Sequence, residues 1–166
     1  KWFSDVWTDI LGALQELNHN ELRDRAGAFP LELPYRLINM YSVYGDTVLD
    51  PFWGTGTTTI ASMICGRSSI GYEIERGFKK AFEERLTEVE NMSESIDRQR
   101  IERHLKFVKD SNGSFKYDSE NYDFPVKTKQ EKSIQLYRVS EIEEKNNHIE
   151  VTHEDFSGPI QERLVS

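Results

Sequence analysis

A glycine-rich turn between a predicted strand and a predicted helix carries the residues of this chain best suited to hold a ligand. Asp50 and Pro51 end an apolar stretch, and Gly54 and Gly56 let the backbone turn tightly and bring amide groups close to a ligand. A helical run that begins at Thr57 would point its N-terminal amides at the same place, which favours a negatively charged or polar group. The pattern predicts a nucleotide-like cofactor site at the carboxyl end of a strand.

The next predicted strand ends in an acid at a separation that suits the same site. Residues 69–74 read Ser-Ile-Gly-Tyr-Glu-Ile, and Glu73 lies 23 residues after Asp50. An acid at the tip of the adjacent parallel strand is placed to accept hydrogen bonds from ribose hydroxyls. Two common phosphate loops are excluded, because no Gly-Lys-Ser/Thr occurs and Thr59 stands where the third glycine of Gly-x-Gly-x-x-Gly would be. For the turn alone, an ordinary strand-to-helix connection is the alternative.

Three segments in a fixed order carry a family resemblance. Residues 50–58, Asp-Pro-Phe-Trp-Gly-Thr-Gly-Thr-Thr, resemble the cofactor motif of S-adenosylmethionine-dependent DNA methyltransferases that modify exocyclic amino groups. Residues 29–38, Phe-Pro-Leu-Glu-Leu-Pro-Tyr-Arg-Leu-Ile, resemble the element before it in β-type members, and residues 71–74 are similar to their second motif. The resemblance covers about residues 2–86. It implies an α/β, Rossmann-like methyltransferase fold, in which helices flank an open, mostly parallel sheet, with S-adenosylmethionine as the cofactor.

The resemblance also implies which residues would contact the cofactor. Phe29 and Pro30 would line the side of the pocket that holds its methionine part, and Glu73 would accept hydrogen bonds from its ribose hydroxyls. The floor and loop of the pocket would consist of Asp50, Pro51, Phe52, Gly54, Gly56 and Thr57. Each residue also has a purely structural alternative: Phe29 could belong to the core, Asp50 could cap the turn, and Glu73 could be a solvated strand end.

A candidate strand near the end of the chain is also followed by an acid. Residues 148–152 alternate in polarity, and Asp155 and Phe156 come shortly after them. The resemblance gives Asp155 a hydrogen bond with the adenine amino group of the cofactor, with a plain strand end as the alternative. His153 and Glu154 would point to opposite faces of the strand, and the chain has no cysteine pair, so we predict no metal site.

The tetrapeptide Asp/Ser-Pro-Pro-aromatic, through which these enzymes act, does not occur in this sequence. Its polar residue accepts hydrogen bonds from the target amine, and its aromatic ring stacks on the flipped base. In β-type members this loop and the DNA-reading region precede the element at residues 29–38, and residues 2–7 resemble the segment that follows them. We therefore expect a C-terminal, cofactor-binding portion, either a fragment or a subunit of a split enzyme, whose DNA contacts lie mostly elsewhere.

The reaction implied is direct methyl transfer to adenine N6 or cytosine N4, as in restriction-modification systems. Carbon-5 methylation of cytosine is excluded, since Cys65 follows Ile64 rather than the conventional proline. One alternative is an RNA guanine amino-methyltransferase, whose catalytic tetrapeptide would follow the third strand. Another is a non-catalytic cofactor-binding subunit, which an exposed apolar face on the isolated domain would favour.

The composition agrees with a folded protein whose surface as a whole is not basic and so does not favour binding to phosphates. The 166 residues carry 21 Lys and Arg against 29 Asp and Glu, a net charge of −8, and the single cysteine fits a reducing cytoplasm. No membrane-spanning run or signal peptide is found in the sequence. Lys127, Lys129 and Lys132 lie near aromatic residues and could touch nucleic acid, but neighbouring acids dilute their charge, so an ordinary exposed loop is the expectation.

Hydrophobic periodicity gives the elements that would position these residues. Helices are expected over residues 5–17 and 34–44 and from Phe78 to about Val89, with Ser93 or Ser95 capping a further helix. Strands are expected over residues 133–139 and 148–152. We predict that residues 1–109 form the methyltransferase core and that residues 110–166 form a strand-containing extension, packed on the same core.

Overall fold

The computed structural model describes residues 7–10, 29–111 and 115–157, and its architecture is mixed α/β, as predicted. Its elements in chain order are α2 (Glu32–Tyr41), β1 (Thr47–Asp50), α3 (Thr57–Ile64), β2 (Ser68–Gly71), α4 (Gly77–Leu86), α5 (Val89–Asp110), β3 (Tyr117–Asp118), β4 (Pro125–Val126), the 3-10 helix η1 (Lys129–Glu131), β5 (Tyr137–Glu144) and β6 (Ile149–Asp155). Most of the helix expected over residues 5–17 lies outside the described residues, and residues 7–10 are not helical.

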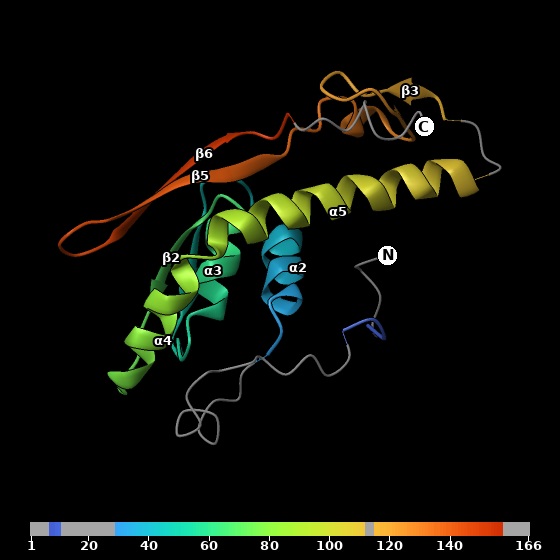
Figure 1. Cartoon of the computed structure of the whole chain (residues 1–166). Helices are drawn as coiled ribbons and strands as arrows, with labels where there is room; N and C mark the ends of the chain where they lie inside the picture. Colours follow the sequence, from blue (N-terminus) through green and yellow to red (C-terminus); the bar gives the residue numbers. More distant parts are fainter. Residues whose placement is uncertain (1–6, 11–28, 112–114, 158–166) are drawn as a thin grey trace.

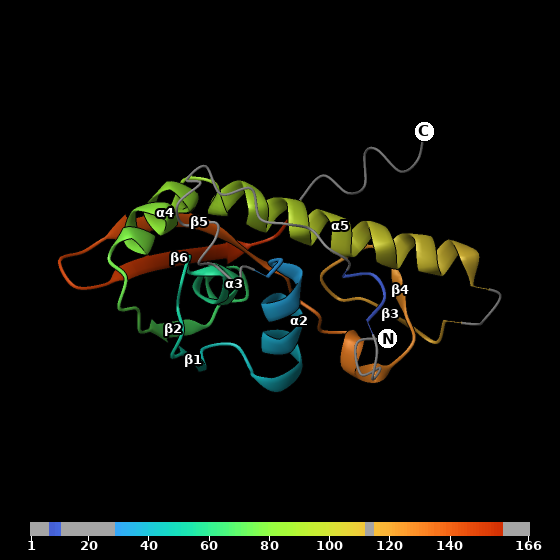
Figure 2. The ribbon, with the colours of Figure 1, turned by 90° about the horizontal axis from the view of Figure 1, so that it is seen from below.

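The first two strands form a parallel pair joined through α3. Leu49 stands opposite Ile70 in the register, and both side chains point away from α3, with 63% and 50% of their surface exposed. Val48, on the other face of β1, packs against the core. In Figure 2, α3, α4, α5 and the β5–β6 hairpin lie on one side of this pair and α2 lies beside it, and the exposure of Leu49 and Ile70 leaves the outer face open in the described part of the chain.

The main core forms around α3. Ile60 of α3 and Val89 of α5 are completely buried, and Val139 of β5 joins the same cluster. A second cluster forms under the C-terminal half of α5 and contains Ile101, Phe124, Val126, Leu136 and Phe156. Helix α5 therefore connects two apolar clusters along its length (Figure 1).

Helix α2 owes its position to a buried arginine. The Arg36 side chain donates from Nε to a Glu32 oxygen at 2.7 Å and from its two terminal nitrogens to both Asp9 oxygens at 3.0 and 2.8 Å. The hydrogen bonds to Asp9 are the main reason that the pKa of Arg36 is raised. Two charged residues of the motif at residues 29–38 thus form an ion-pair network that ties residues 7–10 to α2.

The start of α5 corrects one prediction. The helix begins at Val89, and Ser93 lies inside it, fully buried, rather than capping a separate helix. The Ser93 hydroxyl oxygen accepts a hydrogen bond at 3.0 Å from the backbone N–H of Val139. A buried strand N–H must find an acceptor, and here a helix side chain supplies it.

Strands β5 and β6 form an antiparallel hairpin, with a register shift between Val139 and Glu141. The hairpin packs on α3 and α5, where the His153 Nε2–H donates to the carbonyl oxygen of Met63 at 2.7 Å. The strand expected over residues 148–152 is confirmed as β6, which bonds to β5 and not to β1 or β2. No helix among the described residues has the length and apolar character needed to cross a bilayer.

Candidate functional site

The glycine-rich turn lies where β1 and β2 end side by side. The Tyr72 N–H donates to the Asp50 carbonyl oxygen, and the Trp53 N–H donates to the Tyr72 carbonyl oxygen, each at 3.0 Å. The Asp50 side chain accepts from the Phe52 N–H at 3.0 Å, the turn-capping contact that was its structural alternative. Gly54 and Gly56 have φ values of +51° and +71°, a region that disfavours residues with a Cβ atom.

Glu73 reaches the turn, as the spacing of the two motifs predicts. One carboxylate oxygen accepts from the Gly54 N–H, and the other accepts from the Ile74 and Glu75 N–H groups, all at 2.8 Å. These backbone hydrogen bonds, with that from Glu75 the largest contribution, lower the pKa of Glu73. The carboxylate is therefore negatively charged at neutral pH and is held in place by backbone amides.

Trp53, inside the motif, has a packing role that sequence reasoning missed. Its indole N–H donates to the Thr59 hydroxyl at 2.8 Å, and its ring meets that of Phe82 edge-on, with centroids 4.7 Å apart. A Cβ atom built on Gly71 would lie 2.1 Å from the Trp53 ring, and one built on Gly56 would lie 2.4 Å from the Phe82 ring. Gly56 and Gly71 are thus also required by packing, and not only by the turn.

A half-buried arginine holds the loop through hydrogen bonds, and sequence reasoning missed it too. The Arg85 Nη1 of α4 donates to the Thr55 carbonyl oxygen at 2.8 Å and to the Thr57 hydroxyl at 3.1 Å. Desolvation lowers the pKa of Arg85. The amphipathic pattern of α4 predicts a solvent-exposed charged face. Nothing in the local sequence therefore indicates that Arg85 contacts a loop 28 to 30 residues earlier.

The N-terminus of α3 opens onto the same turn. Gly56 is the N-cap residue, and no side chain caps the helix. The positive end of the helix dipole therefore faces the turn without a side-chain acceptor on it. Thr57, the first helical residue, is buried, with 4% of its surface exposed.

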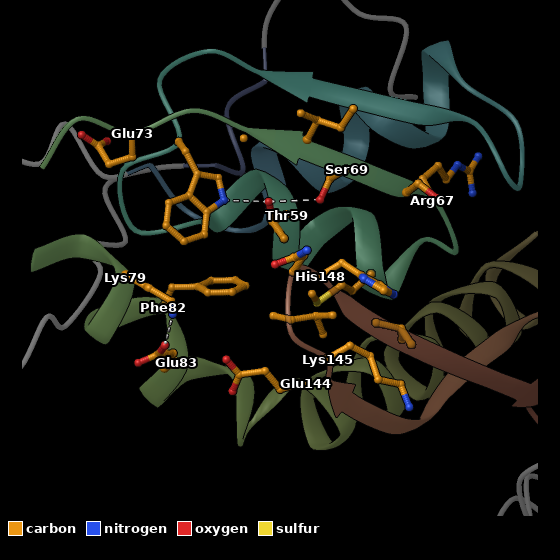
Figure 3. A pocket seen from close by; sticks show the side chains of 18 of the residues that line it. Thr59, Arg67, Ser69, Glu73, Lys79, Phe82, Glu83, Glu144, Lys145 and His148 are labelled. Carbon is orange, nitrogen blue, oxygen red and sulfur yellow. Dashed lines mark hydrogen bonds and ion pairs between the residues drawn. The ribbon is translucent and has the colours of Figure 1, made fainter. Parts of the chain in front are cut away.

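The predicted residues are distributed over an open edge and two cavities. Glu73 lies at one end of a cavity of about 1120 Å³ between β2, α4 and the β5–β6 hairpin, with Lys145 and His148 across from it (Figure 3). Phe29 lines a second cavity, of about 570 Å³, between α2 and β1. Asp50 and Phe52, whose side chain is 87% exposed, line neither and stand at the carboxyl edge of the strands.

Two further residues complete the placement of the predicted set. Pro30 precedes α2, and its carbonyl oxygen accepts from the Leu33 N–H at 3.1 Å. Pro51 belongs to the exposed turn after β1. Ile74, which the sequence analysis did not single out, is 98% exposed next to Glu73 and offers an apolar surface there.

Asp155 is not brought to this site. It closes β6 opposite Tyr137 of the antiparallel partner strand, and it lines neither cavity. The two histidines of the region line the cavity next to Glu73, and each has a partner within the protein: His148 contacts Glu150 at 3.0 Å, and His153 contacts the main chain of α3. No group of three or more His, Cys, Asp or Glu side chains suited to a metal ion occurs within the described ranges.

The site defines a class of protein. A glycine turn and an acid, at the carboxyl ends of two adjacent parallel strands, suit a ligand that presents hydroxyl groups to Glu73 and polar atoms to the turn amides. Residues 1–84 match a family model described as DNA methylase, for N6 and N4 methyltransferases. The chain belongs to this N6/N4 DNA methylase family.

Individual relatives match this chain over different lengths. The type II methyltransferase M.MthZI of Methanothermobacter thermautotrophicus is 51% identical over 164 residues, which is 98% of this chain and 45% of the relative. M.MjaI of Methanocaldococcus jannaschii is 49% identical over 86 residues, 52% of this chain and 27% of the relative. The chain thus spans less than half the length of these curated relatives.

A solved structure matches about half of the chain. It is a candidate DNA modification methylase of Thermus thermophilus, in complex with S-adenosyl-L-methionine. The identity is 38%, over 53% of this chain and 30% of that one, with a TM-score of 0.41. At this TM-score the overlap does not define the fold.

Proposed function

We propose that this chain is the S-adenosylmethionine-binding part of a site-specific DNA methyltransferase that methylates adenine N6 or cytosine N4. The observation that carries the proposal is the Glu73 carboxylate, held 2.8 Å from the Gly54 amide at the ends of β1 and β2 in a member of this family. Bound S-adenosylmethionine would supply the methyl group from its sulfonium centre, and the chain would orient it.

The residues present fit such a cofactor. A carboxylate offers about four acceptor positions, and backbone amides use three at Glu73, so one oxygen can still accept from a ribose hydroxyl. Phe29 and Pro30 would flank the methionine part. The floor of the site would be formed by Asp50, Pro51, Phe52, Gly54, Gly56 and Thr57.

The finer fold is part of the proposal. We propose that β1 and β2 belong to a larger, open, mostly parallel sheet of Rossmann-like type, which other parts of the methyltransferase complete. Parallel sheets are normally covered on both faces, whereas Leu49 and Ile70 leave an apolar pair exposed on the outer face. The catalytic Asp/Ser-Pro-Pro-aromatic loop and most DNA contacts would lie in the completing part, on the same chain or on a partner subunit.

The domain organisation also remains a proposal. Residues 1–109 would form the core and residues 110–166 an extension on it. Support comes from Val139 of the extension, which joins the apolar cluster of Ile60 and Val89. Because DNA is the substrate and the one cysteine is a buried thiol, we propose the cytoplasm as the place of action.

A second candidate is a non-catalytic cofactor-binding subunit, which the exposed Leu49–Ile70 face favours. The two candidates differ in what happens when the completing part is added. A subunit of an active enzyme restores transfer of labelled methyl groups to DNA, whereas a non-catalytic subunit binds the cofactor and leaves transfer unchanged. The match to a family model of DNA methylases argues against the alternative of an RNA guanine amino-methyltransferase.

Calorimetric titration with S-adenosylmethionine tests the proposal. We expect saturable binding, and we expect Glu73→Gln to weaken it by about 1–3 kcal/mol, or about 5- to 150-fold. Glu102→Gln, which makes the same change at an exposed position of α5, serves as the matched control and should bind like the parent. Absence of binding in a chain with a cooperative unfolding transition, or equal binding by the Glu73 variant, contradicts the proposal.

A further inference from the structure

The second half of the described chain lies outside the part that the family model covers. The match ends at residue 84, within α4, whereas α5 and all the strands after it follow. M.MthZI matches over 98% of this chain, but M.MjaI matches over only 52%. The match with M.MthZI therefore includes the later elements, and neither the family model nor the cofactor site accounts for them.

Charge is divided unevenly along the chain. Residues 98–132 carry nine Lys and Arg against six Asp and Glu, a net charge of +3. The rest of the chain carries the remaining 12 Lys and Arg against 23 Asp and Glu, a net charge of −11. The C-terminal half of α5, β3, β4 and η1 thus form a basic end of an acidic molecule, which we call the basic end.

The opposite end of the molecule is acidic. At the β5–β6 hairpin, the Arg138 Nε donates to Glu154 at 2.6 Å, and Lys145 pairs with Glu143 and Glu150. Figure 1 shows the hairpin tip and the C-terminal end of α5 at opposite extremes of the structure. The cations of the hairpin are paired with nearby carboxylates. The two ends of the molecule therefore differ in unpaired charge as well as in residue composition.

Several cations of the basic end lack such partners. Among the described residues, Arg103, Lys106, Lys109 and Lys127 form no ion pair with a carboxylate. Glu131, four residues after Lys127, is already engaged: its carboxylate accepts from the backbone N–H groups of Lys127 and Thr128 at 3.0 and 2.8 Å. The lysine ammonium groups are therefore available to an external anion.

Aromatic rings hold one of these cations in a fixed position. The Lys127 Nζ lies 4.5 Å from the centre of the Phe107 ring and 5.7 Å from that of Phe115, and the two rings meet edge-on. The His104 Nε2–H donates to the Pro125 carbonyl oxygen at 2.9 Å, which fixes this segment against α5. Phe107 is 46% exposed, so the lysine and the ring face solvent together. An ammonium group over exposed rings is ordered at little cost and keeps its charge.

We propose that the basic end binds the phosphate backbone of duplex DNA. The inference rests on the proposed function to the extent that DNA is the substrate, and it adds a surface that the cofactor motifs do not include. Unpaired lysines and arginine along one helix end suit phosphates spaced along a backbone, and they carry no base specificity. The acidic hairpin, at the far end, would be directed away from the polyanion by the same field.

Fluorescence anisotropy with a labelled DNA duplex over a salt series tests this surface. Lys106→Ala, Lys109→Ala and Lys127→Ala should each weaken binding, and each should reduce the slope of log K against log salt by about one. The triple variant should lose most of the salt-dependent affinity. Lys80→Ala, an exposed lysine of α4, is the matched control and should leave the slope unchanged, and Lys127→Arg should keep parental binding.

A triple variant that binds DNA like the parent, or a parent that binds no DNA at low salt, overturns the proposal. Tighter binding of a duplex RNA than of the DNA duplex overturns the choice of DNA. Titration of the same variants with S-adenosylmethionine separates this inference from the proposed function. If the parent chain does not bind the cofactor, only the proposed function is affected, because Glu73 follows β2 whereas the lysines lie in the C-terminal half of α5 and after β4, at the other end of the ribbon in Figure 2.

Discussion

The region around the glycine-rich turn and the region around α5 differ in the sequence distance that their contacts bridge. At the turn, Glu73 and Gly54 are 19 residues apart, and both lie within recognisable motifs. In the later region, Val139 contacts Ser93 over 46 residues, and His153 contacts Met63 over 90. The comparison shows that local motifs organise the first region, whereas the second depends on contacts that no short pattern encodes.

The two regions also use their charges differently. Glu73 and Arg85 hold backbone and hydroxyl groups of the loop, so their charges serve the geometry of the site. Lys106, Lys109 and Lys127 hold no carboxylate among the described residues, so their charges remain available at the surface. Variants in each region should therefore separate cofactor binding from DNA binding.

The largest expected effect comes from Gly56→Ala. The substitution imposes left-handed backbone strain and pushes a Cβ atom against Phe82, which together should lower the free energy of unfolding by about 2–5 kcal/mol. Gly45→Ala has a similar positive φ but open space around it, so its cost should be about 1–2 kcal/mol. Urea unfolding of both variants measures the difference. Equal losses would show that packing against Phe82 contributes nothing.

Ile101→Ala should affect stability and spare the cofactor site. Truncating this buried residue of the second cluster should cost about 2–5 kcal/mol, with S-adenosylmethionine affinity unchanged where the protein remains folded. Ile60→Ala, the matched change in α3, should cost a similar amount and also weaken cofactor binding, because α3 supports the turn. If both variants bind the cofactor equally, the separation between the two regions is wrong.

A smaller effect is expected from Arg85→Met. This variant keeps much of the side-chain volume but removes the hydrogen bonds to Thr55 and Thr57, at a cost of about 1–3 kcal/mol. Because the loop loses its support, S-adenosylmethionine should bind more weakly. Lys80→Met, on the exposed side of the same helix, should change neither property. Thermal unfolding and calorimetry on the two proteins decide the question.

The smallest effect concerns a buried acid in α5. Burial raises the pKa of Asp97 from its ordinary value of 3.8 to about 7, and its Oδ2 atom has no hydrogen-bond partner in the described structure. The unfolded chain ionises first as pH rises, so the fold should lose stability between about pH 4 and pH 7, by at most about 1.4 kcal/mol per pH unit, and change little above that range. Asp97→Asn should remove this loss. Urea unfolding across the range measures it, and an unchanged profile in the variant would contradict the assignment to Asp97.

The turn and its partner acid could be predicted because their signals are local. Strand β1, helix α3 and the approach of Glu73 to the turn follow from glycine, proline and the spacing of two motifs. Strand β2 ends at Gly71, earlier than the predicted residue 74. The backbone after it turns and brings the Glu73 carboxylate to the N–H groups of Ile74 and Glu75.

The later elements could not be predicted to the same extent. Ser93 has the residue type of a helix cap, yet it is buried because a strand 46 residues away needs an acceptor. Strand β5 runs from Tyr137 to Glu144, later than the predicted residues 133–139, because its register is set by β6. Arg85 and Trp53 were missed for a similar reason: their partners are defined by packing and not by sequence neighbours.

The most direct test of the central claim is to map S-adenosylmethionine on the chain by NMR. Amide shifts of the 15N-labelled protein, followed during titration, report which backbone groups the ligand meets. We predict that the largest changes fall on Gly54, Gly56 and the residues next to Glu73, and that the same changes need about 5- to 150-fold more ligand in Glu73→Gln. Changes centred on the β5–β6 hairpin or on Lys127, with the turn unaffected, would contradict it.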